Sequence, residues 1–207
     1  SPFFKKLNQY IRNDLDISAE YDTNKQLNIF DFLYNCAATS NCLQEALIEK
    51  RTMHLLKKKL VELSSFESEV KLQESNDQLI LFACTDIINI FKAFTGCLDG
   101  RRYFLKNPLF TIEANNNAIR SSINTKSFNR LSFYSLGLIS NLIYKEAELC
   151  TAQNFKKIAY EKVLTLHFEY YIKSLKQFLC SNKRFWQEAI SYFFQFLTNI
   201  ITNKELY

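Results

Sequence analysis

The feature of the sequence that most limits its fold is an apolar segment with a single Asn in its second half, which occurs four times. The residues concerned are Asn35, Asn89, Asn141 and Asn199, separated by 54, 52 and 58 positions. In each segment, apolar residues stand five and two positions before the Asn and one position after it, and a residue that is small or polar stands four positions before it. This spacing predicts four helices that are buried around most of their circumference and open along one stripe.

The composition supports a chain built from helices. Three Gly and two Pro in 207 residues supply few of the turns that many short strands would need. Hydrophobic residues make up 47% of the chain and aromatic residues 15%, which is enough for a packed core and argues against disorder. We therefore predict a single all-α domain over residues 1–207.

The Asn-centred segments resemble the third helix of armadillo-like repeats, in which an Asn at this place commonly faces a concave groove. The segment FKAFTGCLDGRRYFLKN, which follows Asn89, looks like the stretch that links one armadillo repeat to the next. The resemblance implies a right-handed superhelix of about four irregular armadillo-like repeats, each longer than the typical repeat of about forty residues. None of the four segments has the Trp that importin-alpha and beta-catenin types often carry four residues before the Asn.

The four amide side chains are the candidate binding groups. An Asn amide both donates and accepts hydrogen bonds, so a row of amides could bind the backbone of an extended peptide whatever its side chains. The alternative is that each amide bonds a neighbouring helix or loop, because buried amides need partners. Residues one and two turns away would line the same stripe, namely Gln78, Lys92, Arg130, Tyr134, Lys145, Tyr192 and Gln195. Several of these are polar or basic, which favours an acidic or phosphorylated partner segment.

We therefore expect a non-catalytic scaffold that binds a segment of another protein in its groove or at an end face. The main alternative is a nucleic-acid-binding helical-repeat module, because the net charge is +5 and basic residues cluster at Arg51, His54, Lys57, Lys58 and Lys59. Acidic residues such as Glu45, Glu49 and Glu62 lie nearby, as on an ordinary solvated helix, so nucleic acid is the weaker hypothesis. A third interpretation is a helical bundle that self-associates.

The last helix raises a separate expectation about the ends of the domain. The chain stops soon after Asn199, and nothing that follows in the sequence covers Phe193, Phe194 and Ile200. Because the end of a solenoid needs a capping element, we expect either that the domain is part of a longer protein or that this helix docks a second copy.

Catalytic and metal-binding motifs are missing from the sequence. There is no GxxxxGK[ST] or GxGxxG loop, and His54 and His167 have no Cys or carboxylate neighbours at ligand spacing. We predict no enzyme activity, no cofactor and no metal. The six Cys are scattered without a CxxC pair, which indicates free thiols and an intracellular protein, in the cytoplasm or the nucleus. No apolar run is long enough to predict a membrane span.

Local signals also predict element boundaries. Helices are expected over residues 3–15, 25–38, 42–63 (as one helix or two), 77–95, 126–144, 154–179 (one or two) and 185–202. Asp77 is expected to cap the helix that carries Asn89. A turn is expected at Asp99 and Gly100, a new helix from Pro108, and a bend at Asn115, Asn116 and Asn117.

Overall fold

The computed structural model describes residues 2–14, 23–49, 51–64, 74–106, 108–122, 128–142 and 183–202, together with residues 172, 175 and 176. Over these ranges the chain forms helices joined by short turns and contains no strand, which confirms the all-α prediction. The helices are α1 (Pro2–Asp14), α2 (Thr23–Thr39), α3 (Asn41–Glu49), α4 (Thr52–Ser64), α5 (Glu74–Phe94), α6 (Leu98–Leu105), α7 (Pro108–Ser122), α8 (Phe128–Leu142) and α11 (Lys183–Ile201). No helix in the described ranges has the length and apolar character needed to cross a membrane.

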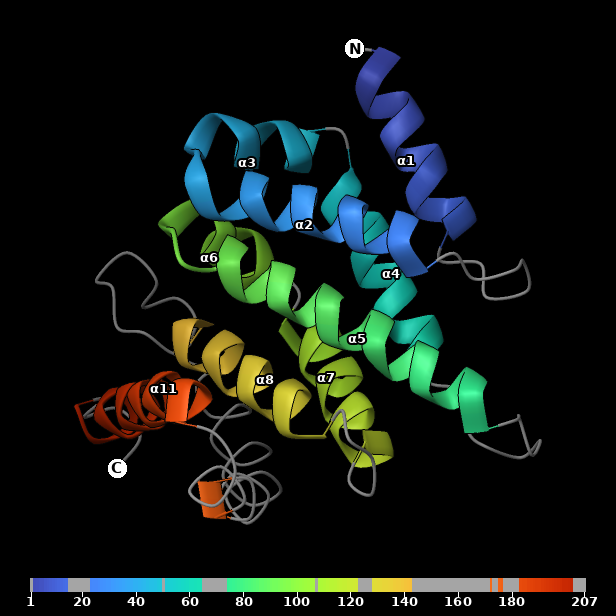
Figure 1. Cartoon of the computed structure of the whole chain (residues 1–207). Coiled ribbons are helices and arrows are strands. Elements are labelled where there is room, and N and C mark those ends of the chain that lie inside the picture. The colour runs from blue at the N-terminus through green and yellow to red at the C-terminus, as the bar shows by residue number, and fades with distance from the viewer. Residues whose placement is uncertain are drawn as a thin grey trace.

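The helices that carry the four Asn residues follow one another in a row. Helix α2 packs against α5, α5 against α8, and α8 against α11 (Figure 1). Helices α4 and α7 pack against each other behind this row, and α1 packs on α4. The sequence segments singled out by their Asn are therefore neighbours in space.

Helix α5 lies at the centre of the core because apolar residues occur on nearly all of its sides. Ile87, Ile88, Phe91 and Phe94 are completely or almost completely buried. The rings of Phe91 and Phe94 lie 4.8 and 6.0 Å from the ring of Phe104, which α6 supplies. Aromatic pairs in these tilted and edge-on arrangements stabilise a core beyond the area that they bury.

Several predicted boundaries are confirmed and others are wrong. Helix α5 ends at Phe94, before Gly96, and α7 begins at Pro108 as expected. Helix α5 begins at Glu74, so Asp77 lies inside it rather than at its cap. The helix predicted over residues 154–179 lies outside the described residues, apart from residues 172, 175 and 176.

The turn expected at Asp99 and Gly100 is also wrong, because both residues belong to α6. The Sγ atom of Cys97 caps this helix by accepting a hydrogen bond from the Gly100 backbone N–H at 3.4 Å. Any Cβ at position 100 would collide with the backbone carbonyl of Phe94. Gly100 therefore permits a close approach of α6 to the end of α5.

The bend expected at Asn115, Asn116 and Asn117 is likewise absent, because α7 continues through all three residues. Asn115 is fully buried, and its Oδ1 accepts a hydrogen bond from Ser135 Oγ of α8 at 2.7 Å. Burial against α8 overrides the weak helix propensity of Asn.

Candidate partner-binding surface

Asn141 ties α8 to the end of α5. Its side chain is half-buried, and Nδ2 donates to the backbone carbonyl of Lys92 at 3.0 Å and to Thr95 Oγ1 at 3.3 Å. The carbonyl of Lys92 lies in the last turn of α5, where carbonyl groups find no backbone N–H donor within the helix. It accepts hydrogen bonds from Thr95 Oγ1 at 3.0 Å and from the amide of Asn141, which links the end of α5 to α8.

Asn199 makes the equivalent connection one helix further along. Its side chain is buried, and Nδ2 donates to the backbone carbonyl of Ser140 at 2.9 Å and to Ser140 Oγ at 3.2 Å. This bond ties α11 to α8. In both cases the amide nitrogen is used between helices, which is the alternative that the sequence left open.

The other two amides have different surroundings. Asn35 is exposed on α2, where its backbone carbonyl accepts a hydrogen bond from Thr39 Oγ1. Asn89 is half-buried on α5, and its buried Oδ1 accepts no hydrogen bond from any described residue. The four amides therefore share a sequence register without sharing one environment.

Lys92 joins three helices of the row through aromatic rings. Its side chain is buried, and Nζ lies 4.7 Å from the ring centroid of Tyr134 on α8 and 4.9 Å from that of Tyr192 on α11. A cation over an aromatic face is attracted by the ring, most strongly where water is excluded. Lys92 is consequently part of the packing between helices, and its charge does not lie on the open surface.

The aromatic cluster around Lys92 depends on the absence of a side chain at Gly137. A Cβ there would lie 2.8 Å from Cδ of Lys92 and 3.4 Å from a ring carbon of Tyr192. Phe133 completes the cluster, with its ring 5.2 Å from that of Tyr192 and 5.7 Å from that of Tyr134. Gly137 thus makes room for the lysine stem between α5, α8 and α11.

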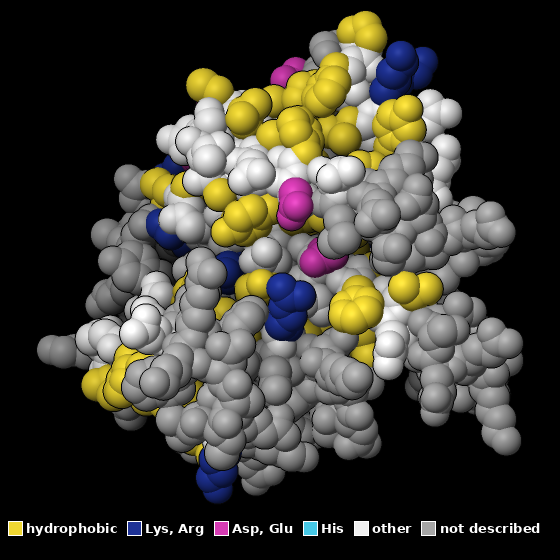
Figure 2. Space-filling view, in the orientation of Figure 1, with side chains coloured by type: hydrophobic (Ala, Val, Ile, Leu, Met, Phe, Trp, Pro, Cys, Tyr) yellow, Lys and Arg dark blue, Asp and Glu magenta, His cyan; other side chains and the backbone are white. Residues whose placement is uncertain are grey.

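Charged groups of both signs meet where α2, α5 and α8 run side by side. Burial raises the pKa of Asp86 on α5 from 3.8 to about 6, Arg130 on α8 lowers it, and Asp31 on α2 raises it further. Asp31 and Arg130 are exposed. Figure 2 shows acidic and basic side chains close together in the middle of this face, with hydrophobic side chains around them.

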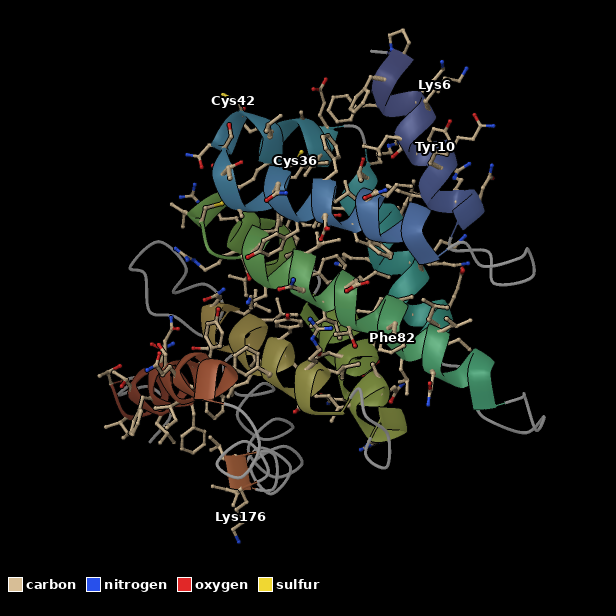
Figure 3. The ribbon with its side chains drawn as sticks, in the orientation of Figure 1. Lys6, Tyr10, Cys36, Cys42, Phe82 and Lys176 are labelled. Atoms are coloured by element: carbon tan, nitrogen blue, oxygen red, sulfur yellow. The ribbon has the colours of Figure 1, made fainter. Side chains whose placement is uncertain are left out.

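An exposed aromatic residue lies on the same side of α5. Phe82 is 42% exposed and stands one turn before Asp86 (Figure 3). The sequence interpretation missed Phe82 and Asp86, although one signal was available for Phe82. Phe82, Tyr134 and Tyr192 each stand seven residues before an Asn, so three of the four segments carry an aromatic residue at one register position.

We call the stripe formed by the exposed Asp31, Asn35, Phe82 and Arg130 and the half-buried Asp86 the row face. Asp31 and Asn35 are one turn apart on α2, as are Phe82 and Asp86 on α5. The electrostatic effects of Asp31 and Arg130 on Asp86 connect the three helices.

The remaining predicted site residues lie elsewhere or are not described. Gln78 is exposed on α5 and Gln195 is half-buried on α11, whereas Lys145 lies outside the described residues. His54 is exposed on α4, and Cys36, Cys42, Cys84 and Cys97 are free thiols. The described part of the chain contains no group of three or more His, Cys, Asp or Glu that could hold a metal ion.

No protein-family model, no curated protein and no solved structure matches the chain. A functional conclusion therefore depends on the arrangement of the residues described above.

Proposed function

We propose that this protein is a non-catalytic scaffold that binds a segment of another protein across the row face. The observation that carries the proposal is the exposed ring of Phe82, which stands one turn from Asp86, a carboxyl whose pKa is influenced by Asp31 on α2 and Arg130 on α8. Protein interfaces commonly centre on a few aromatic or Arg anchors surrounded by polar groups. Covering an exposed Phe removes apolar area from water, worth about 1 kcal/mol for a half-exposed ring.

The order of the helices supports a proposed armadillo-like superhelix. Helices α3, α4 and α5 are followed by α6, α7 and α8, and α4 packs on α7 as α5 packs on α8. In this proposal, α2 and α11 are the third helices of the first and last of four irregular repeats. The row face then lies on the third-helix side, where the resemblance to armadillo-like repeats implies a groove.

The charges of the row face favour a protein partner of mixed polarity. Lys92 is buried among aromatic rings, whereas Arg130 is exposed on the row face and suits an acidic side chain of the partner. Asp31 is exposed and suits a Lys or Arg of the same partner. The two carboxylates repel a phosphate backbone, so the row face supports a protein rather than a nucleic acid.

The proposal is tested by site-specific photo-crosslinking in a nuclease-treated extract. A photoreactive phenylalanine analogue replaces Phe82 in one variant and Leu43 in the other. Leu43 is a matched control because it is 40% exposed on α3, away from the row face.

We expect the probe at position 82 to capture a discrete protein that the probe at position 43 does not. The unlabelled variant Phe82→Ser should lose that protein in affinity capture, and Leu43→Ser should keep it. Identical captures at the two positions, or capture that depends on nucleic acid, would contradict a protein-binding row face.

Helix α11 supports a second candidate, which is self-association. Phe194 and Ile201 are 60% and 65% exposed on this helix, more than is usual for large apolar side chains. Sedimentation at increasing concentration tests it. A dimer that forms in wild type and is lost in Phe194→Ser supports the proposal, whereas a monomer at all concentrations rejects it.

A further inference from the structure

A second surface brings together basic residues that are far apart in the sequence. Helix α1 packs on α4, where Ile11 is buried and Thr52 Oγ1 donates to Asn8 Oδ1 at 2.9 Å. Between the two helices lies a groove of about 330 Å³ that is open to solvent. We call it the α1–α4 groove, and its lining residues are Ile11, Arg12, Leu55, Lys58, Lys59 and Glu62.

Among the described residues that line the α1–α4 groove, positive charge is in excess, with three cations against one carboxylate. Glu62 forms ion pairs with Lys59 at 3.2 Å and with Lys58 at 3.9 Å. Exposed pairs at this helical spacing are weak and easily rearranged. The end of α1 adds roughly half a negative charge through its dipole, which is less than the excess that the side chains provide.

We propose that the α1–α4 groove binds the phosphate group of a phosphorylated side chain in a partner segment. A guanidinium can form two parallel hydrogen bonds to phosphate, so Arg12 orients the group and Lys58 and Lys59 neutralise it. Ile11 and Leu55 provide an apolar floor for the carbon atoms that join the phosphate to the peptide. The volume is near the lower end for ligand sites, and it suits one side chain from a segment that stays outside.

Glu62 has a specific role in this proposal. Its carboxylate pairs with Lys58 and Lys59 and would compete with phosphate for them. Removing its charge should therefore strengthen binding, whereas a purely structural role of the ion pairs would not produce this gain.

The test is an NMR titration of the whole chain with three probes at low salt. The probes are a short Gly-Ala peptide with one central phosphoserine, the same peptide without the phosphate, and inorganic phosphate. We expect saturable shifts confined to the groove residues with the phosphopeptide, none with the plain peptide, and weaker binding of inorganic phosphate.

Variants distinguish binding in the groove from a general attraction of the phosphopeptide to a positively charged protein. Arg12→Gln together with Lys58→Gln should weaken phosphopeptide binding by about tenfold or more, and Glu62→Gln should strengthen it. The matched control, Lys6→Gln with Arg120→Gln, removes two exposed charges elsewhere and should bind as wild type does (Lys6 is marked in Figure 3). The amide spectrum of each variant reports whether it is folded.

Three outcomes would overturn the proposal. The first is shifts spread over all basic residues, and the second is equal loss of binding in the groove and control variants. The third is inorganic phosphate that binds as tightly as the phosphopeptide, because the groove would then recognise a free anion rather than a phosphorylated segment.

Discussion

The Nδ2 atom of Asn141 lies 3.0 Å from the backbone oxygen of Lys92, and this hydrogen bond joins α8 to the last turn of α5. One of the four amides that the sequence suggested as ligand contacts thus holds two helices together. Asn199 holds α11 to α8 in the same manner.

The first prediction concerns the stability supplied by these amides. Asn141→Ala and Asn199→Ala should each lower the free energy of unfolding by about 1–2 kcal/mol, because each variant loses a side-chain hydrogen bond between two helices. Asn35→Ala is the control and should change it by less than about 0.5 kcal/mol, since Asn35 is exposed. Urea unfolding measures all three. If all three variants lowered the free energy of unfolding equally, the hydrogen bonds between helices would not be the source of the stability that Asn141 and Asn199 supply.

The second prediction is a reversal of sign at Gly137. In wild type, Gly137→Ala should destabilise the protein, because the new Cβ would displace the buried stem of Lys92. In a Lys92→Ala background the same change should be stabilising, since Ala is a better helix former than Gly by about 1 kcal/mol. A double-mutant cycle, with stabilities measured by urea unfolding, gives the coupling free energy between positions 92 and 137. Additive effects would mean that Lys92 does not occupy this space.

The third prediction is a dependence on pH that comes from Asp86. Its folded pKa of about 6 exceeds the ordinary value of 3.8, so the folded state binds more protons between these values. The free energy of unfolding contributed by this carboxyl is therefore largest below pH 3.8 and is lost as the pH rises through 6. Asp86→Asn should stabilise the protein by about 1–2 kcal/mol at pH 7.5, allowing for partial solvent exposure, and by little at pH 4.

Urea midpoints of wild type and Asp86→Asn at the two pH values check this dependence. As a control, Arg130→Gln should raise the pKa of Asp86 still further, because Arg130 lowers it in the wild type. An NMR titration of the Asp86 carboxyl that gave a pKa near 3.8 would contradict the prediction.

The fourth prediction concerns Arg51, which lies between α3 and α4 with a φ of 61°. A residue with a Cβ is strained in this left-handed region, whereas Gly is not. Arg51→Gly should therefore raise the free energy of unfolding by about 0.5–1 kcal/mol. His54→Gly, in the first turns of α4, should lower it by a similar amount. Thermal or urea unfolding distinguishes the two, and a loss of stability in both would mean that position 51 is not strained.

The helices of the row could be predicted because each combines a strong apolar period with a polar position in a fixed register. The boundaries that failed depended on contacts between helices. Asn115 is kept in α7 by its bond to Ser135, and Gly100 serves a close approach of two helices rather than a turn. Neither contact leaves a local signal in the sequence.

The site was harder to predict than the fold for a related reason. Whether a polar residue on a helix faces solvent or a neighbour depends on how the helix is rotated in the packed row. Lys92 and Arg130 both seemed to be basic groups of one surface, yet Lys92 is buried under two Tyr rings and Arg130 is exposed. The basic residues of α4 line a groove because α1 packs beside them, and the sequence does not show this packing.

The two amide ties run in one direction along the chain, since each Asn bonds the helix that precedes its own in the row. Local opening should then be graded, with α11 exchanging its amide protons fastest and α5 slowest. Removing the hydrogen bond of Asn199 should increase the opening of α11 alone. Removing the hydrogen bond of Asn141 should increase the opening of α8 and of α11, which packs on it. The order of the helices in the row thus also sets a hierarchy of rigidity.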